Sequence, residues 1–204
     1  MLIDTFVQNE EIFVNDSESY IKNETTNKII SKNTSEGSLI YCNEKDFEEK
    51  IREFRNSRVK QMYNEISIII GHDEYVDGEI SQSEIFIKQA YERGQMDYVM
   101  EALMQIYLKN LSNVHFLEGI LVMISAVPYE IVEPKGQTMA MGLLTNKELL
   151  IRDRAIQCFE QWNSKKGLEV LKSIECQPKW LQKYVDKVIM YIERDGIEPI
   201  SGEP

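Results

Sequence analysis

The sequence predicts a mainly α-helical protein with a small β element at its N-terminus, and two patterns carry this prediction. From residue 44 onward, apolar residues recur at steps of three and four with charged residues between them, as in amphipathic helices. Before residue 44, short β-branched and aromatic runs alternate with Asn, Ser, Thr and Gly clusters, as in short strands and turns. We therefore expect a β-hairpin or three-stranded element in residues 1–43, a helical domain in 44–196 and a loose tail in 197–204.

Residues that favour helix ends divide the helical part into segments. Gly71 follows the first long apolar pattern and is expected to end that helix in a left-handed C-cap. Ser81 and Glu84 form a capping box, in which each side chain binds the backbone N–H of the other, and they predict the start of a helix. Thr145 and Glu148 have the same spacing and predict a second such start.

The most apolar stretch, from 114 to 127, lies between Asn113, which is expected to cap it, and Pro128, which ends it. Because this stretch is hydrophobic all round, we expect a helix at the centre of the domain. It is too short to cross a bilayer. Residues 128–136 are predicted to form a loop, and Asn163 is predicted to begin another helix.

Helices joined by short turns are expected to form antiparallel hairpins. Residues 146–155 resemble the second helix of a HEAT-type repeat, in which an aliphatic residue is followed by Arg and then by Ala three positions later. Ile151, Arg152 and Ala155 occupy those places. The resemblance implies hairpins stacked into an α-superhelix with a concave binding surface. The 128–136 loop interrupts the regular spacing of such repeats, so an irregular helical bundle remains the alternative.

The charge balance excludes some classes of partner. The chain has 204 residues, with 34 Asp and Glu against 23 Lys and Arg, for a net charge of −11. Proteins that bind nucleic acid through its phosphates need surplus cations, so we expect no nucleic-acid partner. The chain shows no Lys/Arg-rich amphipathic face of the kind that binds membrane surfaces, so we expect no membrane partner.

The cysteines and the first residues predict a cytoplasmic protein. No basic segment precedes the first apolar residues, so no signal peptide is predicted. Cys42, Cys158 and Cys176 are widely spaced, and no Cys-x-x-Cys pair occurs. We therefore expect reduced thiols, and Cys158, on an apolar helical stripe, is expected in the core.

Catalytic motifs do not stand out, so the sequence predicts no enzyme, no cofactor and no metal site. Only two histidines occur. His115 lies on the central apolar stretch and is expected to be a hydrogen-bonded core residue rather than a general base. Trp162 and Trp180 lie on apolar stripes, and both are expected to anchor the core.

One segment also resembles an EF-hand calcium loop. Residues 73–84 place suitable residues at positions one, five, six, eight, nine and twelve, namely Asp73, Asp77, Gly78, Ile80, Ser81 and Glu84. Tyr75 occupies the third position, where Asp or Asn normally supplies an oxygen ligand. An Asp-Gly turn followed by a capping box explains the same residues without a metal. A calcium-binding regulator therefore stays an alternative.

The acidic residues concentrate in residues 65–133, which carry twelve acidic and three basic residues. Such a surface attracts a basic protein. We expect a non-catalytic protein-binding module, in its most specific form an immunity or antitoxin-type inhibitor of a basic toxin such as a nuclease. A HEAT-like scaffold or regulatory subunit is the alternative. The candidate binding residues are Asp73, Glu74, Asp77, Glu79, Glu84, Asp97 and Glu101.

Overall fold

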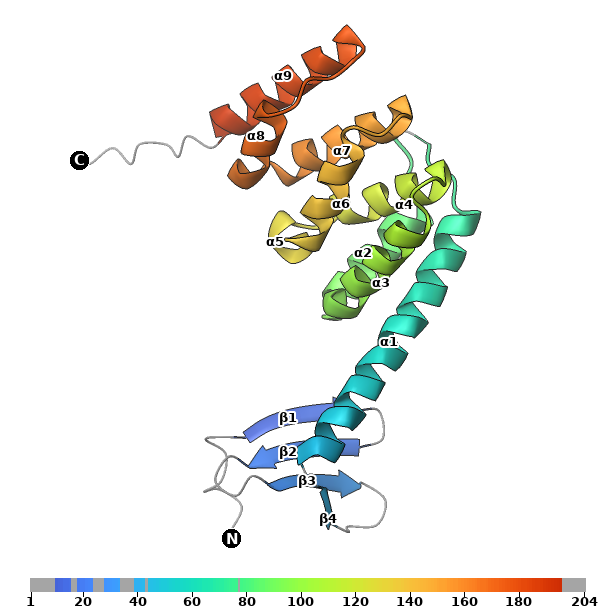
Figure 1. Cartoon of the computed structure of the whole chain (residues 1–204), viewed down its shortest axis with the longest axis vertical. Helices are drawn as coiled ribbons and strands as arrows, with labels where there is room; N and C mark the ends of the chain where they lie inside the picture. The colour runs from blue at the N-terminus through green and yellow to red at the C-terminus, as the bar shows by residue number, and fades with distance from the viewer. Residues whose placement is uncertain are drawn as a thin grey trace, which may run out of the picture. The chain divides into compact units, whose positions relative to one another are not determined.

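The computed structural model describes residues 10–15, 18–23, 28–33, 39–42, 44–76 and 78–195 of the chain (Figure 1). Over these residues the protein is mainly α-helical, which confirms the predicted class. The chain divides into two compact units, residues 1–57 and 58–204. The tail predicted at 197–204 lies outside the described residues. Among the described helices, none is both long and apolar enough to cross a membrane.

The first unit contains an antiparallel sheet in which each strand pairs with the next along the chain. The strands are β1 (Glu10–Asn15), β2 (Glu18–Asn23), β3 (Lys28–Asn33) and β4 (Leu39–Cys42). Ile21 of β2 lies opposite Ile12 of β1 and Ile30 of β3, which defines the register. Helix α1 (Glu44–His72) starts in this unit and continues into the second. The domain boundary predicted at residue 43 stays a prediction.

The second unit consists of the end of α1 and eight further described helices. They are α2 (Gln82–Glu92), α3 (Met96–Lys109), α4 (Val114–Ser125), α5 (Tyr129–Val132), α6 (Lys135–Leu143), α7 (Leu149–Trp162), α8 (Lys165–Lys172) and α9 (Lys179–Asp195). Helices α2, α4, α7 and α9 contact one another in that order and form one row (Figure 1). Helices α3 and α6 contact each other, and they also pack against α4 and α7, respectively. The groove described below crosses the row at α2, α4 and α7.

Helix α4 lies at the centre of the second unit, as its all-round hydrophobicity predicts. It packs against α2, α3 and α7. Five of its apolar side chains are no more than 1% exposed, namely Leu117, Ile120, Leu121, Met123 and Ile124. Because neighbours surround this helix, few of its positions need a polar side chain, and the usual helical alternation disappears.

Two predicted N-caps are confirmed. At the start of α2, Ser81 Oγ accepts a hydrogen bond from the Glu84 amide, and Glu84 Oε2 accepts one from the Ser81 amide, both at 3.2 Å. At the start of α4, Asn113 Oδ1 accepts one from the Phe116 amide at 3.4 Å. These contacts span three residues, so the local sequence alone determines them.

Other predicted helix ends are wrong. Gly71 does not end α1, because the helix continues through it to His72. Thr145 does not cap α7, which begins four residues later, at Leu149, with Glu148 as its N-cap. The amide of Glu148 instead donates to the side chain of a preceding asparagine, in an Asx turn that displaces the predicted capping box.

The segment around the next two helices also differs from its prediction. The predicted loop at 128–136 contains α5 and the beginning of α6. Asn163 does not begin α8. It ends α7 with a left-handed backbone (φ 45°), and Ser164 caps α8. Asparagine suits both roles, since its side chain caps helices and its backbone tolerates positive φ.

The two tryptophans have different environments. Trp162 is buried, and its Nε1 donates to the Ile124 carbonyl at 3.0 Å, so the predicted core role is confirmed. The same prediction for Trp180 is wrong, because this side chain is 51% exposed. Cys158 is fully buried, as predicted, and its Sγ donates to the Leu121 carbonyl at 3.4 Å.

Candidate protein-binding groove

A groove of about 480 Å³ crosses the second unit over α2, α4 and α7. Residues 75, 76 and 78–81, which precede α2, form one of its walls. The groove combines apolar side chains with charged and amide side chains from all four elements, among them Val76, Glu79, Ile80, Glu84, Lys88, Leu121, Val122, Arg154, Gln157 and Gln161. A surface of this composition can receive both parts of an extended peptide, its apolar side chains and its charged ones.

Asp73 anchors the segment that forms this wall. Its Oδ2 accepts a hydrogen bond from the Ser83 amide at 2.7 Å, and its Oδ1 accepts from the amides of Gln82 and Glu74 at 3.2 and 3.1 Å. The first amides of a helix have no partner within the helix, and its dipole favours an anion there. Burial alone would raise the pKa of Asp73, but the hydrogen bonds from Ser83, Gln82 and Glu74 outweigh it and lower the pKa.

Tyr75 attaches the same segment to α4. Its hydroxyl lies 3.1 Å from Ser83 Oγ, and its ring lies 5.5 Å from that of His115, centroid to centroid. Burial raises the pKa of Tyr75 to about 12, with a further contribution from the charges of Asp73 and Glu118 that the Ser83 hydrogen bond opposes. The phenol therefore stays neutral at physiological pH and acts as a packing group.

Two residues beneath Tyr75 allow this close approach. His115 Nε2 lies 2.6 Å from the Ile70 carbonyl oxygen, so the predicted hydrogen bond is present, but the residue is half-buried rather than part of the core. At Gly119 of α4, an added Cβ would lie 2.3 Å from the Tyr75 hydroxyl oxygen and 2.8 Å from a methyl carbon of Ile70. Glycine at this position lets the segment and α1 both reach α4.

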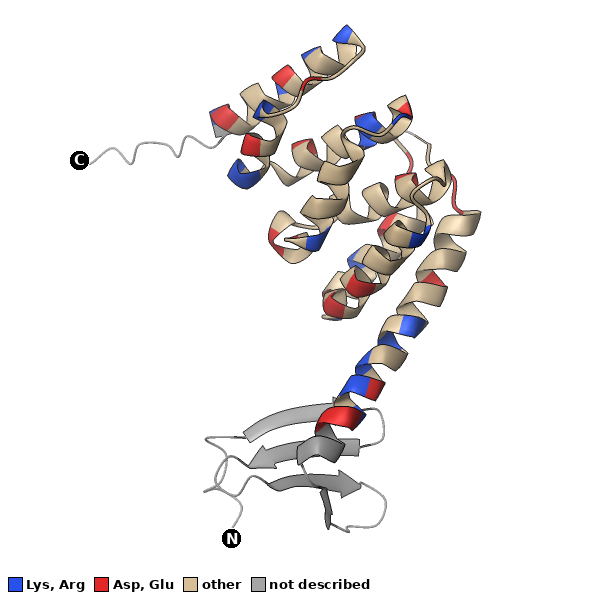
Figure 2. Cartoon of the chain, viewed as in Figure 1, with Lys and Arg blue, Asp and Glu red and all other residues tan. Residues whose placement is uncertain are grey.

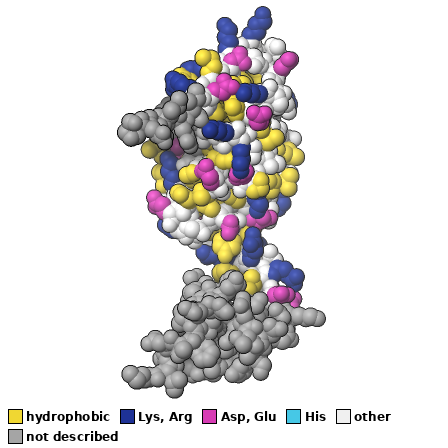
Figure 3. All heavy atoms as spheres, turned by 90° about the vertical axis from the view of Figure 1, so that its left-hand side faces the viewer, with side chains coloured by type: hydrophobic (Ala, Val, Ile, Leu, Met, Phe, Trp, Pro, Cys, Tyr) yellow, Lys and Arg dark blue, Asp and Glu magenta, His cyan; other side chains and the backbone are white. Residues whose placement is uncertain are grey.

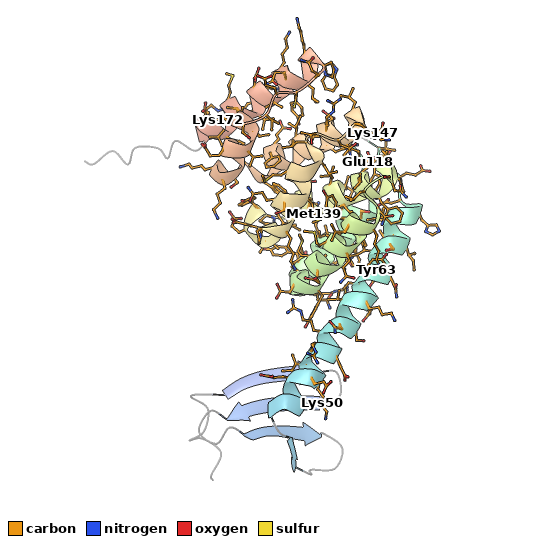
Figure 4. All side chains as sticks on the ribbon, in the orientation of Figure 1. Lys50, Tyr63, Glu118, Met139, Lys147 and Lys172 are labelled. Carbon is orange, nitrogen blue, oxygen red and sulfur yellow. The ribbon has the colours of Figure 1, made fainter. Side chains whose placement is uncertain are left out.

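An ion pair joins the two helices under the groove. Glu118 of α4 (labelled in Figure 4) and Arg154 of α7 are both largely buried, and 3.2 Å separates Oε1 from Nε. Arg154 Nη1 also donates to Gln157 Oε1 at 3.0 Å, and Gln157 Nε2 donates to Asp153 at 3.2 Å. Because buried charges need such partners, this network holds the polar side chains of α7 in place at the groove.

Three of the seven predicted binding carboxylates already serve the fold. Asp73 anchors the segment before α2, and Glu84 completes the capping box and lies 3.6 Å from Lys88 Nζ. Glu101 of α3 forms an ion pair with Lys135 of α6. Such residues are less available to a partner, because a new contact would have to replace an existing one.

The other predicted carboxylates divide by position. Glu74, Glu79 and Asp97 are exposed, and no described side chain pairs with them. Glu79 lines the groove together with Glu84, whereas Asp97 and Glu101, both on α3, do not line it. Asp77 lies outside the described residues. Figure 2 shows Asp and Glu on the segment before α2 and on α2 and α3, so the acidic residues cover more than the groove.

The sequence-based prediction missed the apolar part of the groove. Ile80 is 70% exposed and Val76 is 51% exposed, although both are aliphatic. The sequence did contain a sign of their exposure. Both lie between two helices, in a segment without the helical periodicity that marks core residues. Arg154 and Gln157 were also missed, because only the packing of α7 on α4 turns them toward the groove.

Residues of the proposed calcium loop take part in hydrogen bonds within the chain. The carboxylates of Asp73 and Glu84 accept hydrogen bonds from backbone amides of α2 and its cap. In the part of the chain that the structure describes, no three His, Cys, Asp or Glu side chains converge as a metal site would require. A cation at 73–84 would therefore compete with the contacts that begin α2.

Compared with known protein families, curated proteins and solved structures, the chain matches none. The resemblance of residues 146–155 to a HEAT-type repeat therefore stays a prediction. Ile151 and Ala155, which carry part of it, are fully buried in α7. Arg152 lies near Cys176, where burial raises the pKa of the thiol and the guanidinium partly offsets that rise.

Proposed function

We propose that the chain is a non-catalytic protein-binding module, and that its groove receives an extended segment carrying basic and apolar side chains from a partner protein. The observation that carries this proposal is the groove itself. It places the carboxylates of Glu79 and Glu84 beside the exposed aliphatic side chains of Val76 and Ile80, over a floor from α4 and α7.

The charges of the groove favour a basic segment. Arg154 contributes little net positive field, because the Glu118 carboxylate lies beside it. Lys88 is similarly balanced by Glu84. Glu79 remains as an exposed carboxylate that no described cation neutralises, and Glu74 lies near it along the chain. A Lys or Arg of the partner would meet unsatisfied negative charge here.

The exposed aliphatic residues favour a partner that covers them. Ile80 and Val76 each leave at least half of their surface in water. Covering such side chains contributes on the order of 1 kcal/mol each, because the apolar area is removed from water. Large exposed apolar residues beside a groove are typical of interaction sites.

The most specific form of the proposal is an immunity or antitoxin-type inhibitor in the cytoplasm. A nuclease surface that binds phosphates is basic, and carboxylates can occupy the places of those phosphates. The twelve acidic and three basic residues in 65–133 support this form. The inhibitor needs no cofactor and binds neither nucleic acid nor membrane.

A scaffold or regulatory subunit is the second candidate. The row formed by α2, α4, α7 and α9 favours it, since stacked helical pairs of the HEAT type present such a row to their partners. A scaffold would use positions along the whole row. An inhibitor of the proposed form would depend mainly on the wall formed by residues 75, 76 and 78–81 and on the acidic residues around it.

The experiment compares two matched double variants. Glu79→Gln with Ile80→Ser removes one carboxylate and one exposed aliphatic side chain from the groove. Glu92→Gln with Leu108→Ser removes the same chemistry from exposed positions outside it. Binding is measured by calorimetry against a purified candidate toxin and against a labelled peptide of Lys, Arg and Leu.

The groove variant should bind about tenfold or more weakly, with a shallower salt dependence, because one charge contact and one apolar contact are lost. The control variant should bind like the unmodified protein. If both variants bind equally well, the groove is not the site. Heat released on titration with millimolar calcium would instead support a calcium-binding regulator.

A further inference from the structure

Helix α9 carries a second candidate binding surface, and its charged residues are basic, whereas the groove favours a basic partner. Its inner side carries Leu181, Val185, Val188 and Ile192, all buried against α7 and α8. A helix turns about 100° per residue, so the side chains opposite these four form a stripe roughly 120° wide. We name this the basic-aromatic stripe, and it consists of Lys179, Trp180, Lys183, Lys187, Tyr191 and Arg194.

No carboxylate of the described part of α9 lies within this stripe. Asp186 falls on its border and accepts a hydrogen bond from Gln182 at 2.8 Å. Glu193 also falls on the border and forms an ion pair with Lys172 of α8 at 2.7 Å. Of these two carboxylates, only that of Glu193 contacts α8.

The cations of the stripe are accessible. Lys179, Lys183 and Lys187 are exposed and form no ion pair with any described side chain. Lys187 Nζ and the Arg194 guanidinium lie 5.4 and 5.0 Å from the centroid of the Tyr191 ring. Lys and Arg side chains project at the top of the molecule in Figure 3, where Figure 1 places α9.

The aromatic side chains of the stripe are partly exposed among the described residues. Trp180 is 51% exposed and Tyr191 is 36% exposed, and the neighbouring Met190 is 69% exposed. Helix α9 contacts α7 and α8 on its inner side. Half-exposed Trp and Tyr beside Lys and Arg are the residue types enriched at protein interfaces.

We propose that the basic-aromatic stripe docks an acidic segment of a partner protein, one that carries Asp or Glu together with an aliphatic or aromatic side chain. The three lysines of the stripe supply the charge complement, and Trp180 and Tyr191 supply the apolar contact. The stripe shares no residue with the groove, so this contact is separate from the proposed binding of a basic segment.

The charge of the whole chain favours a short acidic segment over a nucleic acid. At physiological salt, charges act over about 8 Å, so a short segment meets mainly the local cations. A long polyanion would also meet the rest of a chain whose net charge is −11. A membrane is disfavoured because the continuous apolar side of α9 is buried in the core, where lipid cannot reach it.

The test measures binding of a short fluorescein-labelled peptide of Asp, Glu and Leu to the full chain by anisotropy. Lys183→Gln with Lys187→Gln removes two cations of the stripe, and Lys60→Gln with Lys165→Gln removes two exposed cations elsewhere. The stripe variant should bind about fivefold or more weakly, because two charge contacts are lost. The control should stay within about twofold of the unmodified protein.

Trp180 provides a second readout, since Trp162 is buried and only Trp180 is half exposed. The peptide should protect tryptophan fluorescence from quenching by acrylamide, and Trp180→Phe should abolish that protection. The proposal is overturned if the peptide does not bind, or if both lysine variants lose equal affinity. It is also overturned if only a single-stranded oligonucleotide or phosphatidylserine vesicles bind. Glu79→Gln with Ile80→Ser should leave affinity for the acidic peptide unchanged, which separates this test from that of the groove.

Discussion

The carboxylate of Asp73 is the contact that holds the groove wall on the beginning of α2, and replacing it with Asn tests this role. Asp73 accepts three hydrogen bonds from backbone amides, the shortest at 2.7 Å from Ser83. In Asp73→Asn, one oxygen remains, and the new NH₂ group faces an amide that is itself a donor. The exposed neighbour Glu74 supplies the control, since Glu74→Gln changes the net charge equally without removing a side-chain contact.

We expect Asp73→Asn to lower the free energy of unfolding by about 2 kcal/mol at neutral pH. A hydrogen bond to a charged group contributes roughly 1.5–3 kcal/mol, and loss of a helix cap costs about 0.5–2 kcal/mol. Asp73 is only 9% exposed, so solvent screens these contacts little. For a unit of this size the same loss corresponds to a fall in Tm of about 4–8 °C. Glu74→Gln should change the free energy by less than about 0.5 kcal/mol.

The stability that Asp73 contributes should decrease at acidic pH. The hydrogen bonds lower the pKa of Asp73 in the folded state, whereas an unfolded Asp titrates near about 3.9. Its contribution is therefore complete above the unfolded pKa and is lost as the pH falls through the folded pKa. The difference between the unmodified protein and Asp73→Asn should be constant from neutral pH to about pH 5 and should shrink below about pH 4.

Urea unfolding followed by tryptophan fluorescence measures this difference at each pH. Both tryptophans, Trp162 and Trp180, lie in the second unit, and the buried one reports loss of its core. Equal stability of Asp73→Asn and Glu74→Gln at neutral pH would refute the anchoring role. A difference that persists unchanged below about pH 3 would refute the electrostatic explanation.

Three further predictions concern the packing around the groove. Gly119→Ala should cost about 1–3 kcal/mol, because the added Cβ would lie 2.3 Å from a hydroxyl oxygen, whereas Gly71→Ala, with no atom within 4 Å, should cost nothing measurable by the same urea titration. Glu118→Leu should lower the free energy of unfolding by about 3 kcal/mol, because it removes a buried carboxylate beside Arg154. Adding Arg154→Met should recover at least half of that loss. Equal unfolding midpoints for the single and double variants would contradict this. Cys158, whose pKa is raised by burial, should react with a thiol reagent only as fast as the core opens, and rapid native-state labelling in mass-spectrometric peptide mapping would show the burial to be wrong.

The features that local sequence predicts well are those in which the interacting groups are close along the chain. The capping box at Ser81 and Glu84 joins residues three apart, so no distant contact is needed to form it. The central place of α4 was also predictable, because a helix that is apolar on all sides is stable only when neighbours surround it. For His115, the predicted hydrogen bond is present, but the residue is half-buried rather than part of the core.

Predictions failed where two local solutions compete. Asn163 suits either end of a helix. In the structure its left-handed backbone ends α7, and α7 contacts α8. From the sequence, Trp162 and Trp180 were both expected to anchor the core. Only Trp162 is buried, because residues of α4 and α5 cover it, whereas Trp180 is 51% exposed.

By itself, the sequence determined the helical class, the central helix and the acidic character of residues 65–133. Only the tertiary structure decided which acidic residues surround a groove and which stabilise the fold. The ion pair between Glu118 and Arg154 joins residues 36 positions apart, and Asp73 binds amides nine and ten positions away. Hydrophobic periodicity shows which side of a helix is buried, but the neighbour that covers it depends on packing over the whole unit.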